Sequence, residues 1–163
     1  EVARLIESRG HAVVRRSRRP DGHRGEPCGD AVVLGDTMGE LRKMYALATC
    51  VFVGRSLVDM GGSDMIEAAA LGRPTAFGPY TQNFPQADAL ADNGCVRVAD
   101  GEALANQLAH WLSDPDAAAR AGRDAREYVR GQQGATRRNV ELVRRLLEDR
   151  RGAPRETAGG NDA

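Results

Sequence analysis

The chain has 163 residues, and its 23 lysines and arginines are balanced by 23 aspartates and glutamates, which gives a formal net charge of zero at neutral pH. This balance excludes a strong overall electrostatic attraction to nucleic acids or acidic membranes, so we expect no nucleic-acid partner. The length favours one domain that buries roughly two thirds of its surface. No apolar stretch approaches the roughly 20 residues of a membrane-spanning helix, so we expect these residues to form a soluble unit.

The cysteines and histidines argue against disulfides and metal ligation. The three cysteines are odd in number and none forms a Cys-x-x-Cys pair, which favours free thiols in a reducing compartment. The histidines are dispersed without the spacing of metal ligands, so we predict no metal site and no cofactor. These residues are Cys28, Cys50, Cys95, His11, His23 and His110.

Short apolar segments alternate with helical patterns from the start of the chain to about residue 100. The sequence begins inside a helical pattern that stops at Gly10, from which we expect an N-terminally truncated chain. The alternation of strands and helices indicates βαβ units with right-handed crossovers, and therefore an α/β fold with a doubly wound parallel sheet. We predict strands at residues 11–17, 31–35, 50–54, 74–78 and 96–100, and helices at residues 37–48, 63–71 and 86–94.

The pattern changes at Gly101, where the strands stop. Three amphipathic helices are predicted at residues 102–114, 115–132 and 134–151, and we interpret them as a helical wrap over the sheet. The last residues have no apolar periodicity, so we expect a disordered tail at 151–163 after one domain at 1–150.

The apolar residues of these segments define the expected core. Runs such as residues 50–54 are nearly all apolar, as expected for parallel strands that helices cover on both faces. We place Val32, Val33, Leu34, Val51, Phe52, Val53, Ala76 and Phe77 in central strands, covered by Leu41, Met44, Ile66, Leu90, Leu108, Trp111 and Leu112.

Three of the predicted strands are followed by unusual loops. The loop after Gly35 reads DTMGE, the loop after Gly54 reads RSLVDMGGSD, and the loop after Gly78 reads PYTQNF. Ligands of doubly wound sheets bind beyond the carboxyl ends of the strands, where helix N-termini offer free N–H groups and partial positive charge. We therefore expect an anion such as phosphate at these strand ends, although a turn alone also explains Asn83 of the third loop.

The stretch GGSDMIEAAALG, which begins at Gly61, is the most informative of these segments. Gly61 and Gly62 permit a close backbone approach, and Glu67 can accept hydrogen bonds from the vicinal hydroxyls of a ribose. This interpretation predicts a nucleotide site. A plain turn at the glycines and a helix-dipole role for Glu67 explain the same residues without a ligand, just as Thr37 and Glu40 fit a capping box.

Three stretches taken together are far more specific than any single motif: LGDTMGELRKMYALATCVFVGRSLV, GGSDMIEAAALGRPTAFGPYTQNF and GQQGATRRN. They resemble the C-terminal domain of the bacterial 3-deoxy-D-manno-octulosonic acid (Kdo) transferases, over about residues 34–147. The resemblance implies the donor-binding, Rossmann-like half of a GT-B glycosyltransferase. It also implies CMP-Kdo as donor, lipid A or its precursor as acceptor, and an inverting, metal-independent transfer in lipopolysaccharide biosynthesis.

The resemblance assigns the residues of this chain to the donor side of the cleft. It implies no catalytic residue here, because the general base belongs to an N-terminal domain that is missing, together with the leading strand of the donor domain. We therefore expect the fragment alone to be inactive, and membrane contact at the cytoplasmic face of the bacterial inner membrane through the missing half. The implied donor-side residues are Gly39, Glu40, Ser56, Gly61, Gly62, Ser63, Asp64, Glu67 and Asn83.

The sequence departs from the family pattern in two places. Arg55 stands where the family usually has a second glycine, and Ser63 and Asp64 stand where it usually has a His-Asn pair. Asp64 would bring negative charge near the donor phosphate, a cost that Arg55 or another cation can offset. Two alternatives stay open: a GT-B transferase for another nucleotide sugar, and a degenerate donor domain that acts as a non-catalytic interaction module.

Overall fold

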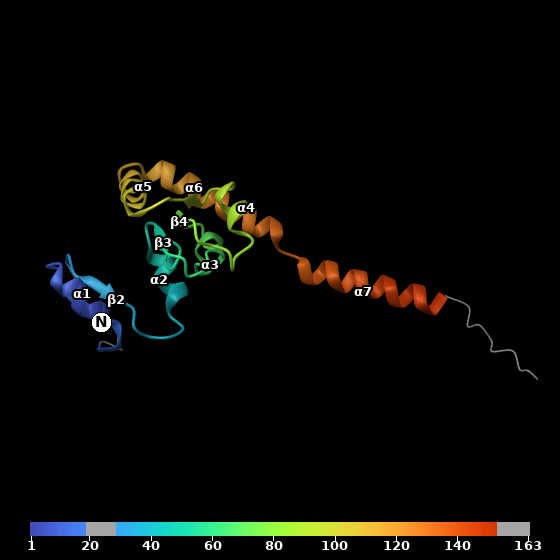
Figure 1. Ribbon diagram of the computed structural model, residues 1–163. Helices are drawn as coiled ribbons and strands as arrows, with labels where there is room; N and C mark the ends of the chain where they lie inside the picture. Colours follow the sequence, from blue (N-terminus) through green and yellow to red (C-terminus); the bar gives the residue numbers. More distant parts are fainter. Residues whose placement is uncertain (19–28, 153–163) are drawn as a thin grey trace, which may run out of the picture.

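The computed structural model describes residues 1–18 and 29–152 (Figure 1). The helices are α1 (Val2–Ser8), α2 (Leu41–Leu47), α3 (Ile66–Ala70), α4 (Ala87–Ala91), α5 (Gly101–Ser113), α6 (Pro115–Gln132) and α7 (Ala135–Gly152), with one 3-10 turn, η1 (Arg16–Arg18). The strands are β1 (Val13–Arg15), β2 (Val32–Leu34), β3 (Val51–Val53), β4 (Thr75–Phe77) and β5 (Val96–Arg97). The predicted alternation of strands and helices is confirmed, and the expected tail falls almost entirely outside the described residues.

The strands are parallel but form two sheets in place of the single sheet that we predicted. β1 pairs with β2 in one sheet, with Val13 opposite Val32, and β3, β4 and β5 form the second sheet in that order. In the larger sheet Val51 lies opposite Thr75, and Ala76 lies opposite Val96. In Figure 1 the small sheet and α1 lie beside the larger body, to which the loop at residues 35–40 connects them.

The core is built on the two faces of the β3–β4–β5 sheet. On one face Val51, Val53 and Phe77 pack with buried residues of α3, α4 and α6. On the other face Ala76 packs with Trp111 of α5 and with the first half of α6, and Phe52 joins this cluster. Since successive side chains of a strand point to opposite faces, the run from Val51 to Val53 supplies both clusters. The prediction of strands covered on both faces is confirmed for this sheet.

Four predicted core residues are wrong. Val32 is 37% exposed and Val33 is 54% exposed, because the two-stranded sheet lacks the double cover of the larger one. Leu41, the first residue of α2, is 52% exposed, and Leu112 is 64% exposed while its neighbour Trp111 points inward. The other predicted core residues are buried or half-buried.

Helix α6 approaches the backbone of two turns that precede strands. A Cβ on Gly122 would lie 2.2 Å from the carbonyl oxygen of Gly72, and a Cβ on Gly94 would lie 2.5 Å from that of Ala121. The N-terminus of α6 is stabilised in two ways. The Asp114 side chain accepts a hydrogen bond from the backbone N–H of Ala117 at 2.8 Å, and a proline occupies the first turn. The long helix is thus fixed to the turns after α3 and α4.

Helix α7 does not share this packing and extends away from the body in Figure 1. Its apolar side chains are more than half exposed, and ion pairs join Arg144 to Glu148 and Arg145 to Glu141. No helix within residues 1–18 and 29–152 is long and apolar enough to cross a membrane. The exposed apolar residues of α7 are Val140, Leu142, Val143, Leu146 and Leu147.

Two alanine substitutions in α6 should have opposite effects on stability. Gly122→Ala should lower the free energy of unfolding by about 1–3 kcal/mol, because the added methyl group collides with the Gly72 carbonyl. Gly131→Ala, in the same helix with open space around its Cβ, should raise it by about 0.5 kcal/mol through lower backbone entropy. Urea unfolding of both variants measures this, and equal effects would contradict the close contact.

Candidate functional site

The loops that follow β3 and β4 meet at the carboxyl edge of the larger sheet. We call residues 54–67 and 78–86 together the strand-end site. Ser56 holds the two loops together, because its carbonyl oxygen accepts the N–H of Tyr80 at 3.0 Å and its hydroxyl accepts the N–H of Gly78 at 2.8 Å. Seven of the nine predicted donor-side residues lie in these two segments, Gly39 and Glu40 lie outside them, and the role of all nine in donor binding stays a prediction.

The side chain of Ser56 is completely buried and both of its hydrogen-bonding functions are in use. Its hydroxyl donates to the carbonyl oxygen of Val53 at 2.5 Å while accepting from Gly78. A Cβ on Gly78 would lie 2.1 Å from the Ser56 carbonyl oxygen, so the two loops touch through their backbones. These contacts give Ser56 a structural role beneath the site.

The two glycines of the opening motif adopt a conformation that other residues rarely adopt. Gly61 has φ 78° and Gly62 has φ 79°. A Cβ on Gly61 would lie 2.0 Å from the amide nitrogen of Asn83, and a Cβ on Gly62 would lie 2.9 Å from the Tyr80 carbonyl oxygen. The space beside the two glycines is therefore taken by the neighbouring loop of the same chain, and the predicted approach of a phosphate to their backbone stays a prediction. The N–H of Gly62 also donates to the Arg55 carbonyl oxygen at 3.1 Å.

Helix α3 begins three residues later than the sequence predicted. It starts at Ile66, whose backbone N–H donates to Asp64 Oδ1 at 2.8 Å. Asp64 is exposed, whereas Ser63 and Glu67 are half-buried. Glu67 lies in the first turn of this helix, as predicted. Because the N-cap of α3 is Met65 and Asp64 forms a turn just before it, the glycine pair is part of the preceding loop and does not itself form the helix N-terminus.

Tyr45 of α2 is a neighbour of this acidic group that the sequence analysis did not assign to the site. Burial raises the pKa of its phenol, and the negative charges of Glu67 and Asp64 raise it further. The phenol is half-buried and packs beside the core. The feature of the sequence that could have identified Tyr45 was its place on the inner face of α2, the helix that contacts α3.

Gly39 and Glu40 belong to a different loop, which is bound to η1. Arg16 donates to both carboxylate oxygens of Glu40, at 3.0 Å and 3.1 Å, and the Thr37 hydroxyl donates to one of them at 2.5 Å. The hydrogen bond from Thr37 and then the charge and donors of Arg16 lower the pKa of Glu40. Thr37 and Glu40 do not form a capping box, because their side chains bond to each other and not to backbone N–H groups, and Glu40 is itself the N-cap of α2.

Asp36 fastens the same loop to the first strand. Its carboxylate accepts hydrogen bonds from the hydroxyl and backbone N–H of Ser17 and from Arg15 Nε, at 2.7–2.8 Å. These bonds hold the pKa of Asp36 well below its usual range, and the two bonds from Ser17 lower it most. Asp36 therefore acts as a link to β1 and η1.

Acid should weaken this link. Because the folded-state pKa of Asp36 is lowered, its contribution to stability is complete above about pH 5 and declines as the pH falls below the unfolded value of about 3.9 toward the folded value. NMR titration should therefore detect the Asp36 carboxyl titrating well below 3.9 in the wild type. Ser17→Ala should move the pKa upward, since it removes the largest cause of the shift. A wild-type carboxyl that titrates near 3.9 in the folded chain would refute the link.

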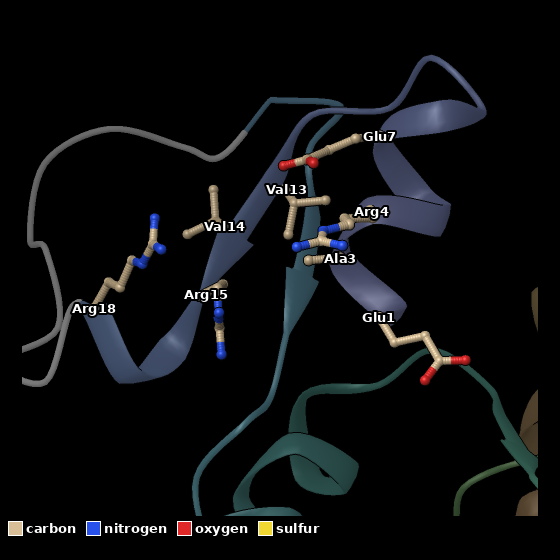
Figure 2. A pocket seen from close by; sticks show the side chains of 8 residues that line it. All are labelled: Glu1, Ala3, Arg4, Glu7, Val13, Val14, Arg15 and Arg18. Carbon is tan, nitrogen blue, oxygen red and sulfur yellow. The ribbon is translucent and has the colours of Figure 1, made fainter.

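Besides an apolar cavity between α3, α4 and α6, which Ile66 and Gln86 line, two further cavities lie near these loops. One, of about 530 Å³, lies between α1 and β1 (Figure 2) and has residues such as Arg4, Glu7 and Arg18 in its wall, but none of the predicted donor-side residues. The other is lined by the loop after β4 and by Arg97, which forms an ion pair with Asp88 at 2.5 Å. The second cavity adjoins the strand-end site, because Pro79, Thr81, Gln82, Phe84 and Pro85 of that site line it.

The histidines, cysteines and acidic residues are scattered in the part of the chain that the structure describes. Within it, no cluster of three or more histidine, cysteine, aspartate or glutamate side chains could hold a metal ion. Cys50 and Cys95 are free, and burial raises the pKa of Cys95 to about 12. His23 and Cys28 lie outside the described residues.

Removal of the Ser56 hydroxyl should destabilise the chain. Ser56→Ala leaves the buried N–H of Gly78 without its acceptor, so the free energy of unfolding should fall by about 1–3 kcal/mol. Ser113→Ala is the matched control, since that exposed hydroxyl only donates to the carbonyl of its own helix, and we expect a change within about 0.5 kcal/mol. Chemical denaturation compares them, and a Ser56→Ala variant as stable as the control would contradict the bridge.

The comparisons with known proteins point to one enzyme family. No family model matches the chain. A Bordetella pertussis protein described as 3-deoxy-D-manno-octulosonic acid transferase is 35% identical over 146 residues, which are 88% of this chain and 33% of that protein. A Haemophilus influenzae protein of the same description is 33% identical over 120 residues, 72% of this chain and 28% of that protein. The chain thus spans about a third of the length of these relatives.

A solved structure agrees with these relatives. It is the C-terminal CMP-Kdo binding domain of WaaA from Acinetobacter baumannii, which superposes with a TM-score of 0.69 at 28% identity. The match covers 77% of this chain and 65% of that one. The described fold is accordingly that of a C-terminal GT-B domain.

Proposed function

The chain is a homologue of the 3-deoxy-D-manno-octulosonic acid (Kdo) transferases, and we propose that it is the donor-binding domain of such an enzyme. The domain would hold CMP-Kdo while Kdo is transferred, with inversion, to lipid A or its precursor. The observation that carries this proposal is the match in fold and sequence to a CMP-Kdo binding domain. The acceptor site and the general base would belong to the part of the enzyme that this chain does not cover, at the cytoplasmic face of the inner membrane.

The strand-end site offers groups that suit a cytidine nucleotide. Glu67 is half-buried in the first turn of α3, where its carboxylate can accept hydrogen bonds from both hydroxyls of a ribose. The fixed loops supply polar backbone groups around it at the edge of the sheet where α/β folds bind ligands. The contribution of this domain to transfer would be to hold the donor and to stabilise the negative charge that develops on the leaving CMP.

A degenerate, non-catalytic module is the second candidate, and Asp64 is the observation that favours it. Its carboxylate is exposed, would lie beside a nucleotide bound at the strand-end site and would disfavour another negative charge there. One of its oxygens accepts the Ile66 N–H, which spreads part of that charge into the helix terminus. Saturable binding of CMP separates the two candidates, and a panel of nucleotide sugars separates Kdo transfer from another GT-B activity.

Substitution of Glu67 should weaken CMP binding with little change in stability. If the carboxylate holds the ribose, Glu67→Gln should lose about ten- to a hundredfold in CMP affinity. This loss corresponds to the roughly 1.5–3 kcal/mol that a hydrogen bond to a charged group contributes. Isothermal titration of CMP measures this loss. A role limited to the helix dipole predicts a lower melting temperature and unchanged affinity.

Two controls make this test specific. The 2′,3′-dideoxy analogue of CMP lacks the diol and should bind the wild type and Glu67→Gln alike. Glu102→Gln removes an acid from the first turn of α5 and should leave CMP affinity unchanged. If Glu67→Gln still prefers CMP over the dideoxy analogue as strongly as the wild type does, Glu67 does not bind the ribose.

A further inference from the structure

Arg55 has a backbone conformation that favours glycine. Its φ is 61°, and among the residues that the structure describes it is the one non-glycine residue with a positive φ. A side chain in this left-handed region costs free energy that glycine would avoid. Arg55 is the second residue after the end of β3 and the second residue of the strand-end site. The cost of an arginine at this position calls for a role of its side chain.

The contacts of Arg55 hold it at the edge of the loop. Its carbonyl oxygen accepts the N–H of Gly62 at 3.1 Å, and its guanidinium Nη2 donates to the Met60 carbonyl oxygen at 3.1 Å. The residue is exposed, so the remaining guanidinium N–H groups face solvent. The backbone of Arg55 thus closes the turn that carries the two glycines, while its charge stays at the surface of the site.

The charges of the strand-end site are unbalanced. Its residues include three acids, Asp59, Asp64 and Glu67, and one lysine or arginine, which is Arg55. The carboxylate of Asp59 accepts a hydrogen bond from Gln82 at 2.6 Å. Within the described residues, the ion pairs join Arg55 to none of the three acids. An anionic ligand at this site would therefore meet two nearby carboxylates on α3 and the loop before it, and one cation.

We propose that Arg55 binds the phosphate of the nucleotide donor at the strand-end site. This inference rests on the proposed function, since it assumes a cytidine nucleotide there. The planar guanidinium presents several N–H donors to phosphate oxygens, and its charge offsets the repulsion from Asp64 and Glu67. The bond to Met60 leaves donors free and limits the positions that the side chain can take.

The test compares three proteins with two ligands. Wild type, Arg55→Gly and Arg55→Lys are titrated with CMP and with cytidine, which lacks the phosphate. Arg55→Gly should melt at the same or a higher temperature, because glycine relieves the backbone strain. It should nevertheless lose about tenfold or more in affinity for CMP and none for cytidine. Arg55→Lys should recover part of the CMP affinity, and Arg123→Gln, which removes an exposed charge on α6, should change neither ligand.

The outcomes separate this inference from the function on which it rests. If wild type binds CMP and Arg55→Gly binds it equally well, the assignment of Arg55 is wrong and the donor-binding role stands. Equal losses for CMP and cytidine also overturn the assignment, since they would show that Arg55 only shapes the loop. If wild type binds neither CMP nor CMP-Kdo, the proposed function fails and the role of Arg55 fails with it.

Discussion

The buried hydroxyl of Ser56 is the interaction on which the arrangement of the site depends. It connects the last residue of β3 to the first residue beyond β4, and the same residue also anchors Tyr80 through its backbone. Since no surface of Ser56 is exposed, water cannot replace these hydrogen bonds while the chain is folded. The loops after the two strands therefore have one relative position, and a ligand at this edge would meet a surface that is already formed.

Much of the fold follows from patterns that are local in sequence. Apolar runs such as Val51–Val53, bounded by glycines and helical periodicity, predict parallel strands under helices because burial on both faces demands continuous apolar residues. The division into two sheets was not predictable in this way, since Val32 and Val33 look like any buried strand. Whether a strand is covered depends on tertiary partners, which the periodicity of its own residues does not contain.

The candidate site was predictable in position but not in its internal contacts. Strand ends and helix starts locate it, because parallel strands bring their carboxyl ends to one edge. The roles of Gly62 and Ser56 depend on Tyr80 and Gly78, which lie about twenty residues away in the sequence. A glycine that admits a ligand and a glycine that admits its own chain have the same sequence signature. Only the contacts of the glycine in the folded chain tell the two cases apart.

The buried thiol of Cys95 makes local opening of the sheet measurable. Its thiol is 3% exposed just before the edge strand β5, and burial raises its pKa to about 12, so the thiolate is rare in the folded chain at neutral pH. Alkylating reagents react with the thiolate, so they would modify Cys95 essentially when β5 separates from β4. The rate of labelling would then measure how often β5 separates from β4. This edge of the sheet carries Arg97, which lines the same cavity as the loop after β4. Slower labelling in the presence of a nucleotide would measure how far a bound molecule suppresses these excursions.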